Sequence, residues 1–242
     1  MVKKALNETL SKFRRDPLRL IKISLDKMFI GPLKYGRGRD YDAAGYWSDR
    51  LSKYGDSLQG PGCEGLSHQE NERRYMEVTK SFTDLCVEEG VKLDEARVLE
   101  IGPGTGYFTR LLRDGGVRGY VGADITDVCF PKLAAEFPEY MFIKADVTSE
   151  GVRGEFDVVI MIDVVVHIMT ETKFASAMAN VKRCLKYGGV FIVSPVMDKN
   201  RRYLFYNRGW SVEDFKSVFP GYVVREYVLL GYRMLAIKKQ NG

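Results

Sequence analysis

Three glycines at alternate positions, Gly102, Gly104 and Gly106, constrain the fold of this chain more than any other stretch. They follow a mostly apolar run at residues 98–101 and precede a helical pattern at residues 107–113. This order predicts a strand, a tight turn and a helix. Glycine suits such a turn because it accepts positive φ angles and lets a ligand approach the backbone. We therefore expect a nucleotide-type site at the carboxyl end of a first strand, facing the N–H groups of the helix.

Two features distinguish this turn from a dinucleotide-binding one. The dinucleotide pattern is G-x-G-x-x-G, and its third glycine would fall on Tyr107. Glu100 would repel a pyrophosphate and suits a cationic ligand better. The string that begins at Glu100 resembles motif I of the class I S-adenosylmethionine (SAM)-dependent methyltransferases. The resemblance implies SAM as cofactor and S-adenosylhomocysteine (SAH) as product. The implied cofactor contacts of this string are Glu100, Gly102, Gly104 and Gly106.

Composition and charge placement limit the partners of the chain. Its 242 residues predict one α/β domain with an extension. Residues 1–40 contain 11 Lys and Arg against 4 Asp and Glu, a net charge of +7, and the remaining 26 against 28 give −2. This placement argues against a broad nucleic-acid-binding face on the main domain. We read no signal peptide and no apolar run of about 18–20 residues. We expect a cytoplasmic protein with reduced cysteines.

Residues 1–30 predict two short amphipathic helices. The second begins at Pro17, and its pattern ends at Gly31-Pro32. Its apolar stripe consists of Leu18, Ile21, Leu25, Met28 and Phe29. Two interpretations stay open. The basic pair of helices rests peripherally on the anionic inner face of a membrane, or the stripe packs on the domain or on a second subunit of a homodimer. The chain is expected to be a monomer or a homodimer.

An aromatic segment precedes the main domain. Residues 33–66 are rich in Gly, Tyr, Asp and Arg, and class I methyltransferases often place such a segment as a lid over the cofactor. The resemblance would place Tyr46 and Trp47 near the sulfonium, where aromatic faces favour a cation, and Arg50 at the cofactor carboxylate. Alternatively, Trp47 anchors the extension to the core. We therefore divide the chain into an extension and lid, residues 1–66, and a methyltransferase domain, residues 67–242.

Two further strands end in acids. Residues 119–124 predict a second strand, and Asp124 at its tip is placed for hydrogen bonds to ribose hydroxyls, a device that NAD enzymes share. Residues 140–147 predict a third strand. The resemblance implies that Asp146 accepts from the adenine amino group and that Val147 packs on the ring. It also implies cofactor contacts from Ile125, next to the end of the second strand, and from Ile162 in the fourth strand.

The fourth strand and its exit, residues 156–168, resemble the segment F-D-x-V-x-x-x-[DE]-V-L-x-H-I of the same family. Asp163 and His167 are the candidate catalytic residues at this sheet edge. His167 is the better base by its ordinary pKa, although the motif histidine can also be structural, and Asp163 can orient it or cap a helix. Val166 weakens any metal-dependent interpretation, and we expect no metal.

The remaining segments complete the predicted fold. Residues 188–194 predict a fifth strand, and a loop with Lys199, Arg201, Arg202 and Arg208 follows. This loop either binds an anionic substrate or is a solvated surface loop. Residues 222–230 and 232–239 predict an antiparallel hairpin. By resemblance, the fold is a doubly wound α/β, Rossmann-like sheet of seven strands, order 3-2-1-4-5-7-6, with the last strand antiparallel and a helical N-terminal extension.

The predicted function is SAM-dependent methyl transfer to a hydroxyl of a small or carrier-linked molecule, with a sugar or glycan favoured. The string [DN]-P-P-[YF], usual in enzymes that methylate base amino groups, is replaced after the fourth strand by Ile162-Asp163-Val164-Val165. No nucleic-acid partner is therefore expected. One alternative is a soluble N- or O-methyltransferase of a metabolite. The other is a non-catalytic protein that binds SAM.

Overall fold

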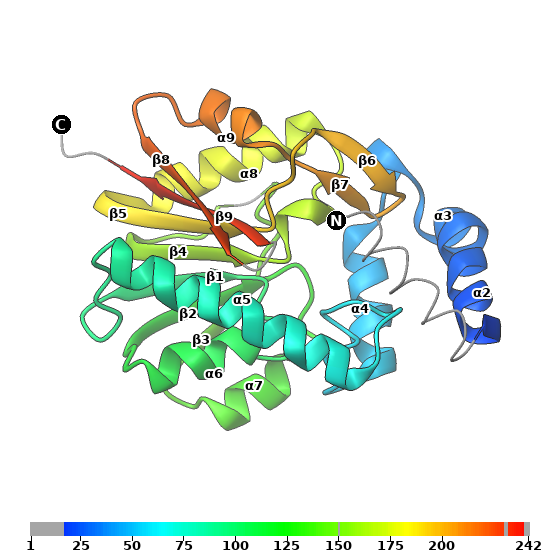
Figure 1. Cartoon of the computed structure of the whole chain (residues 1–242). Helices are drawn as coiled ribbons and strands as arrows, with labels where there is room; N and C mark the ends of the chain where they lie inside the picture. Colours follow the sequence, from blue (N-terminus) through cyan, green and yellow to red (C-terminus); the bar gives the residue numbers. More distant parts are fainter. Residues whose placement is uncertain (1–16, 150, 230–231, 240–242) are drawn as a thin grey trace.

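The computed structural model describes residues 17–149, 151–229 and 232–239, built around a seven-stranded sheet (Figure 1). The strand order is β3-β2-β1-β4-β5-β9-β8, and β9 is antiparallel to both of its neighbours. Because β8 and β9 are the sixth and seventh strands of this sheet along the chain, the predicted order and orientation are confirmed. The strands are β1 (Arg97–Ile101), β2 (Gly119–Asp124), β3 (Met141–Lys144), β4 (Phe156–Ile162), β5 (Leu185–Ser194), β8 (Val223–Leu229) and β9 (Tyr232–Lys238).

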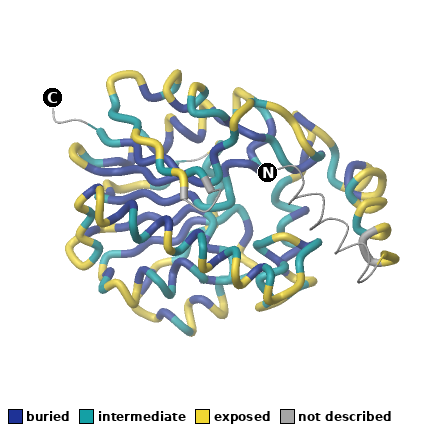
Figure 2. Tube along the Cα trace, in the orientation of Figure 1, coloured by how far each residue is buried: buried dark blue, intermediate teal, exposed yellow. Residues whose placement is uncertain are grey.

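Helices cover both faces of the sheet. One hydrophobic cluster joins the sheet to α8 and α9, and a second joins it to α5, α6 and α7. Burial on both faces explains why β4 reads as a continuous apolar run. Figure 2 shows the strands as the buried centre of the molecule. These helices are α5 (His68–Glu88), α6 (Tyr107–Asp114), α7 (Phe130–Glu136), α8 (Glu171–Cys184) and α9 (Val212–Val218).

Local sequence signals mark the ends of several elements. A capping box between Ser67 and Glu70 starts α5, and a second between Ser211 and Asp214 starts α9. The third strand is shorter than the predicted residues 140–147. Its chain leaves the sheet because the side chain of Asp146 accepts a hydrogen bond from Thr148 N at 2.8 Å, which forms a turn.

The N-terminal pattern continues beyond Gly31-Pro32, contrary to the sequence prediction. α2 (Pro17–Leu25) is followed by one π-helical turn, η1 (Asp26–Ile30), and by α3 (Gly31–Tyr35). Gly31 N donates to Asp26 O, five residues back. Pro32 has no N–H to donate, and its position in the first turn of α3 is one that tolerates proline. The chain therefore turns only at Gly36, where φ is 74°.

The predicted apolar stripe of α2 faces outward. Leu18 is 79% exposed, and the same face continues onto α3, where Leu33 is 86% exposed. Figure 2 shows this end of the molecule as mostly exposed. The inward side instead carries residues at four-residue spacing, Ile23, Lys27, Gly31 and Tyr35. The described part of the chain does not cover the stripe, so the interpretation that it packs on its own domain is wrong. The exposed members of this outer face are Leu18, Ile21, Leu25, Met28, Phe29, Ile30 and Leu33.

A two-stranded hairpin holds this extension in place. The predicted basic loop forms β6 (Arg201–Leu204) and β7 (Asn207–Gly209), an antiparallel pair separate from the main sheet. At its turn, Phe205 packs so closely on Gly31 that a Cβ there would lie 2.6 Å from the Phe205 ring. Lys34 Nζ and the Tyr35 hydroxyl both donate to Asp49 Oδ2, at 2.6 and 2.7 Å, which ties α3 to α4 (Ala43–Tyr54). A short 3-10 turn, η2 (Gly38–Asp40), joins α3 to α4.

Glu89, at the carboxyl end of α5, joins that helix to the final hairpin. Its carboxylate, with a fully buried side chain, accepts from Arg225 Nη1 at 2.8 Å and from the Tyr227 hydroxyl at 2.5 Å. Lys238 Nζ lies 2.7 Å from its Oε2. A buried carboxylate needs such partners to remain charged.

We expect Glu89→Gln to lower the free energy of unfolding by about 1–3 kcal/mol, because Arg225, Tyr227 and Lys238 lose a charged acceptor. The loss is limited because Arg225 and Lys238 are partly exposed and water can solvate them. Urea unfolding followed by circular dichroism measures the change. Glu88→Gln, one residue earlier and exposed, is the matched control. Equal stability of the two variants would show that Glu89 is not an anchor.

Candidate functional site

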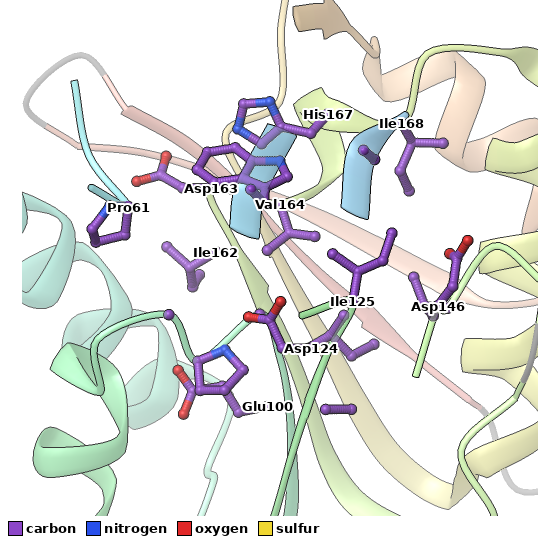
Figure 3. A pocket seen from close by; sticks show the side chains of 18 of the residues that line it. Pro61, Glu100, Asp124, Ile125, Asp146, Ile162, Asp163, Val164, His167 and Ile168 are labelled. Carbon is purple, nitrogen blue, oxygen red and sulfur yellow. The ribbon is translucent and has the colours of Figure 1, made fainter. Parts of the chain in front are cut away.

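A pocket of about 1120 Å³ opens at the carboxyl ends of β1, β2 and β4, beneath α4 (Figure 3). The glycine turn after β1 forms its floor. Gly102, Gly104 and Gly106 have φ angles of 79°, 53° and 84°. A Cβ on Gly102 would lie 2.2 Å from Val164 Cγ2, so the turn packs against the exit of β4 only because this residue is glycine. Gly102 and Gly104 line the pocket, whereas Gly106 precedes α6 and does not line it.

Three acids lie in a row where adjacent strands end, since β1, β2 and β3 are neighbours in the sheet. Glu100, Asp124 and Asp146 all line the pocket (Figure 3). Burial raises the pKa of Glu100 to about 7, although the Tyr120 and Thr109 hydroxyls donate to its Oε2 at 2.5 and 2.8 Å. A ligand that favours the ionised form of Glu100 will release a proton when it binds.

Asp124 has the same kind of environment. Burial raises its pKa to about 6, against backbone donors that include Thr126 N, 3.1 Å from its Oδ1. The other walls of the pocket are largely apolar. They include Trp47 from α4 and the side chains of Ile125, Val147 and Ile162. An apolar slot with a few convergent acids is the usual form of a cofactor site.

Asp163 marks the far end of the pocket. It follows β4 and has a φ of 60°, the one non-glycine residue with positive φ in the described ranges. Its Oδ1 pairs with Arg74 Nη2 at 2.5 Å, and its N–H donates to Ser194 O at 2.8 Å. Its Oδ2 is buried without a hydrogen-bond partner among the described residues. Backbone strain and a buried orphan acceptor in one residue are costs that concentrate at functional sites.

His167 lies beside Asp163, on the 3-10 turn η3 (Val165–His167). Its Nδ1 is 2.8 Å from Tyr206 O. A carbonyl only accepts, so Nδ1 carries the proton and Nε2 is left as an acceptor. The Trp47 ring centroid lies 4.6 Å from that of His167. Desolvation by these neighbours lowers the pKa of His167 to about 4, which keeps the imidazole neutral at physiological pH.

Two predicted cofactor contacts lie elsewhere. Tyr46 packs into an aromatic cluster with Tyr206, at a centroid distance of 4.8 Å. Arg50 is buried and donates to the Tyr46 hydroxyl at 3.0 Å and to Gly62 O at 2.5 Å. Neither residue lines the pocket described above. Trp47 does line it and also packs on the aromatic cluster, so the alternatives weighed for it are compatible.

A second cavity, of about 660 Å³, adjoins the first. Pro61, Asp163 and His167 line both. Its other walls come from α5, the 61–64 loop, the β6–β7 turn and η1. Arg74 and Lys27 belong to this cavity, and the sequence analysis did not single them out as site residues. Arg74 has no local motif, and it reaches Asp163 across 89 residues of chain.

No cluster of three or more potential metal ligands occurs among residues 17–149, 151–229 and 232–239. Over the same ranges, none of the helices combines the length and the apolar character needed to cross a bilayer.

The fold agrees with comparisons to known proteins. Residues 45–222 match the methyltransferase-domain family, so the chain belongs to that family. It has the class I fold of SAM-dependent enzymes. No curated protein matches the sequence.

Solved structures share the fold at low identity. Magnesium protoporphyrin IX methyltransferase from Synechocystis, with bound SAM, is 16% identical with a TM-score of 0.60, covering 82% of this chain and 98% of that one. A 1,6-didemethyltoxoflavin N1-methyltransferase from Burkholderia thailandensis is 17% identical, TM-score 0.56, covering 82% and 89%. An amino pentose methyltransferase from Micromonospora echinaspora, with bound SAM, is 13% identical, TM-score 0.58, covering 72% and 98%.

We expect the His167 imidazole to stay neutral, with its proton on Nδ1, from pH 7.5 down to about pH 5. Its pKa is lowered to about 4, so protonation begins only below that range. Nitrogen-detected NMR of the ring reports tautomer and charge. The chain has two histidines, so in a His68→Gln variant all histidine ring signals come from His167. Protonation near pH 6.5 would contradict the assignment.

Proposed function

We propose that this protein transfers the methyl group of SAM to a hydroxyl of a small or carrier-linked molecule, with a sugar or glycan as the favoured acceptor. The observation that carries the proposal is the position of His167. Its unprotonated Nε2 belongs to a side chain that lines both the strand-end pocket and the adjoining cavity. A base between a cofactor pocket and a second cavity is suited to receive the proton of an acceptor hydroxyl.

The first pocket fits SAM. The turn at Gly102 and Gly104 has no Cβ to block a ligand, and buried Glu100 suits a cationic group. In this proposal Asp124 accepts from the ribose hydroxyls and Asp146 from the adenine amino group. Trp47, Ile125, Val147 and Ile162 supply the apolar contacts. Gly106 holds the conformation of the turn without contacting the cofactor. Tyr46 and Arg50 stabilise the lid by packing and hydrogen bonds, and they do not contact the cofactor.

SAM supplies a methyl group already activated by its sulfonium. The chain must then place the acceptor oxygen in line and exclude water. The ion pair between Asp163 and Arg74 stabilises the backbone turn that leads to His167, and the Tyr206 carbonyl fixes the tautomer of His167. These residues act as positioning groups for the base in this proposal.

Two alternatives remain distinguishable. A soluble metabolite N- or O-methyltransferase has the same cofactor site, and the toxoflavin and amino pentose enzymes act on small molecules. A non-catalytic SAM-binding protein would bind the cofactor without turnover, although the three strand-end acids argue against loss of the site.

The outer face of α2 and α3 suits contact with an anionic membrane surface. Seven large apolar side chains are exposed there, and residues 1–40 have a net charge of +7. This combination is typical of interfacial helices. In this proposal residues 1–66 form an extension and lid on a methyltransferase domain of residues 67–242, and the protein lies in the cytoplasm, peripherally at the inner membrane face.

We expect label from methyl-labelled SAM to enter the lipid and glycan fraction of a host lysate, rather than its small-molecule, protein or RNA fractions.

His167→Ala should lower the rate of methyl transfer at least tenfold with little change in SAM affinity, because it removes the proton acceptor. His68→Ala, at an exposed residue, is the control. Label in the small-molecule fraction would favour the metabolite enzyme. Binding without any label would favour the non-catalytic protein.

We expect Asp124→Ala to weaken SAM binding by about 1–3 kcal/mol, the scale of losing hydrogen bonds to a buried polar group. Isothermal calorimetry measures the affinity. Asp127→Ala, three residues later at an exposed ion pair with Lys144, is the matched control. If both variants bind SAM like the unmodified protein, Asp124 does not hold the ribose.

We expect the full chain to float with vesicles that contain anionic lipid, and the triple variant Leu18→Ser, Leu25→Ser, Phe29→Ser to stay in solution. Each replaced side chain is at least 49% exposed, so the fold should persist. Neutral vesicles serve as the control. If the variant changes only the oligomeric state, the face joins two copies of the chain instead.

A further inference from the structure

We propose that the second cavity is the acceptor site and that it binds an anionic group of the substrate, a phosphate or a carboxylate, through Lys27 with Arg50 behind it. This inference rests on the proposed function, because it makes the cavity the acceptor side of the same reaction. It narrows the substrate class to a hydroxyl compound that also carries a phosphate or a carboxylate, such as a sugar acid or a phosphorylated sugar.

The charges that line the cavity do not balance. Among the described residues, three cationic side chains line it, Lys27, Arg50 and Arg74, against two carboxylates, Glu64 and Asp163. Because His167 is neutral, these described residues leave one positive charge over. Lys53, which lies outside the cavity lining, adds another by pairing with Glu64 at 3.0 Å.

Arg50 is the cation that this arrangement compensates least. It is 7% exposed, and its hydrogen bonds go to neutral oxygens of Tyr46, Gln59 and Gly62, at 3.0, 3.2 and 2.5 Å. Its Nε has no hydrogen-bond partner among the described residues, and Arg50 forms no ion pair within 4 Å with any of them. Glu64 acts on Arg50 through Coulombic attraction but forms no ion pair with it within 4 Å. The charge of Arg50 is therefore only partly compensated, and it attracts an anion into the adjoining space.

Lys27 supplies a donor that can reach the anion. The π-helical turn directs it inward, where its side chain is 16% exposed, while its neighbours Met28 and Phe29 point outward. Its Nζ lies 5.6 Å from the centre of the Tyr206 ring and 4.0 Å from Glu64 Oε2. A lysine on a flexible stem is a common point-charge partner for phosphate.

The anion would lie close to the base. The Tyr206 ring is 5.8 Å from the His167 ring, centre to centre, and the two residues are joined by the bond from Nδ1 to the Tyr206 carbonyl. A negative charge in the same cavity favours the protonated imidazole, so it would raise the pKa of His167 when the acceptor binds. The free enzyme would then hold a weak base that strengthens only when a substrate of the right charge is present.

Inorganic phosphate tests the site in the SAH-bound full chain. Cys63 lines the cavity and is exposed, so its alkylation by iodoacetamide, followed by mass spectrometry, reports occupancy. We expect phosphate to slow this reaction in the unmodified protein. Lys27→Met should raise the phosphate concentration needed for protection roughly tenfold or more. Lys34→Met is the matched control, since Lys34 is a neighbouring exposed lysine that pairs with Asp49 and does not line the cavity.

The outcomes are separable. Absence of protection by phosphate, or equal protection in Lys27→Met, overturns the proposal. Protection of Cys63 by glucose 6-phosphate or glucuronate but not by glucose supports it, and the more effective of the two acids identifies phosphate or carboxylate. Equal protection by glucose overturns it. SAM turnover is measured separately, so an anion site that is present in a protein without turnover would contradict only the proposed function.

Discussion

The ion pair between Arg74 and Asp163 is the interaction on which both cavities depend. It joins the N-terminal part of α5 to the end of β4, and the Asp163 N–H donates to Ser194 O at the end of β5. With its φ of 60°, Asp163 could not hold this turn unless neighbours on two sides fixed it. His167 follows four residues later, so the position of the candidate base derives from the same corner. Loss of Arg74 would leave the half-buried carboxylate of Asp163 without its cation, and an uncompensated charge there would destabilise the fold.

The buried charges of the site follow a common logic. Glu100 and Asp124 are acids whose pKa values burial raises, and His167 is a base whose pKa burial lowers. Burial therefore shifts each group towards its neutral form, because an uncompensated charge is expensive there. Ligands with complementary charge are what would make the charged forms favourable. Protonation and ligand binding are thus coupled at both ends of the site.

Local signals in the sequence were sufficient for most of the fold. The glycine turn and the final hairpin depend on residues close together in the chain, and both are confirmed. Hydrophobic periodicity predicted the apolar stripe of α2 but not what covers it. Periodicity shows which side of a helix is apolar, and it carries no information about what that side contacts.

The parts that escaped prediction depend on contacts between distant residues. Arg74 lies in an ordinary helical stretch and gains its role from a strand end 89 residues away. The aromatic cluster that turns Tyr46 away from the pocket includes Phe205 and Tyr206. Those residues lie in a hairpin that the sequence presents as a basic loop.

The π-helical turn at Asp26–Ile30 fixes how the two sides of the extension are oriented relative to each other. Each residue of a helix advances the direction of its side chains by about 100°. Removing one residue between Ile21 and Leu25 would therefore turn Leu18 and Ile21 by about 100° around the helix axis while Lys27 kept its place in the second cavity. The angle between these two apolar side chains and the cavity is in this sense encoded by helical phase.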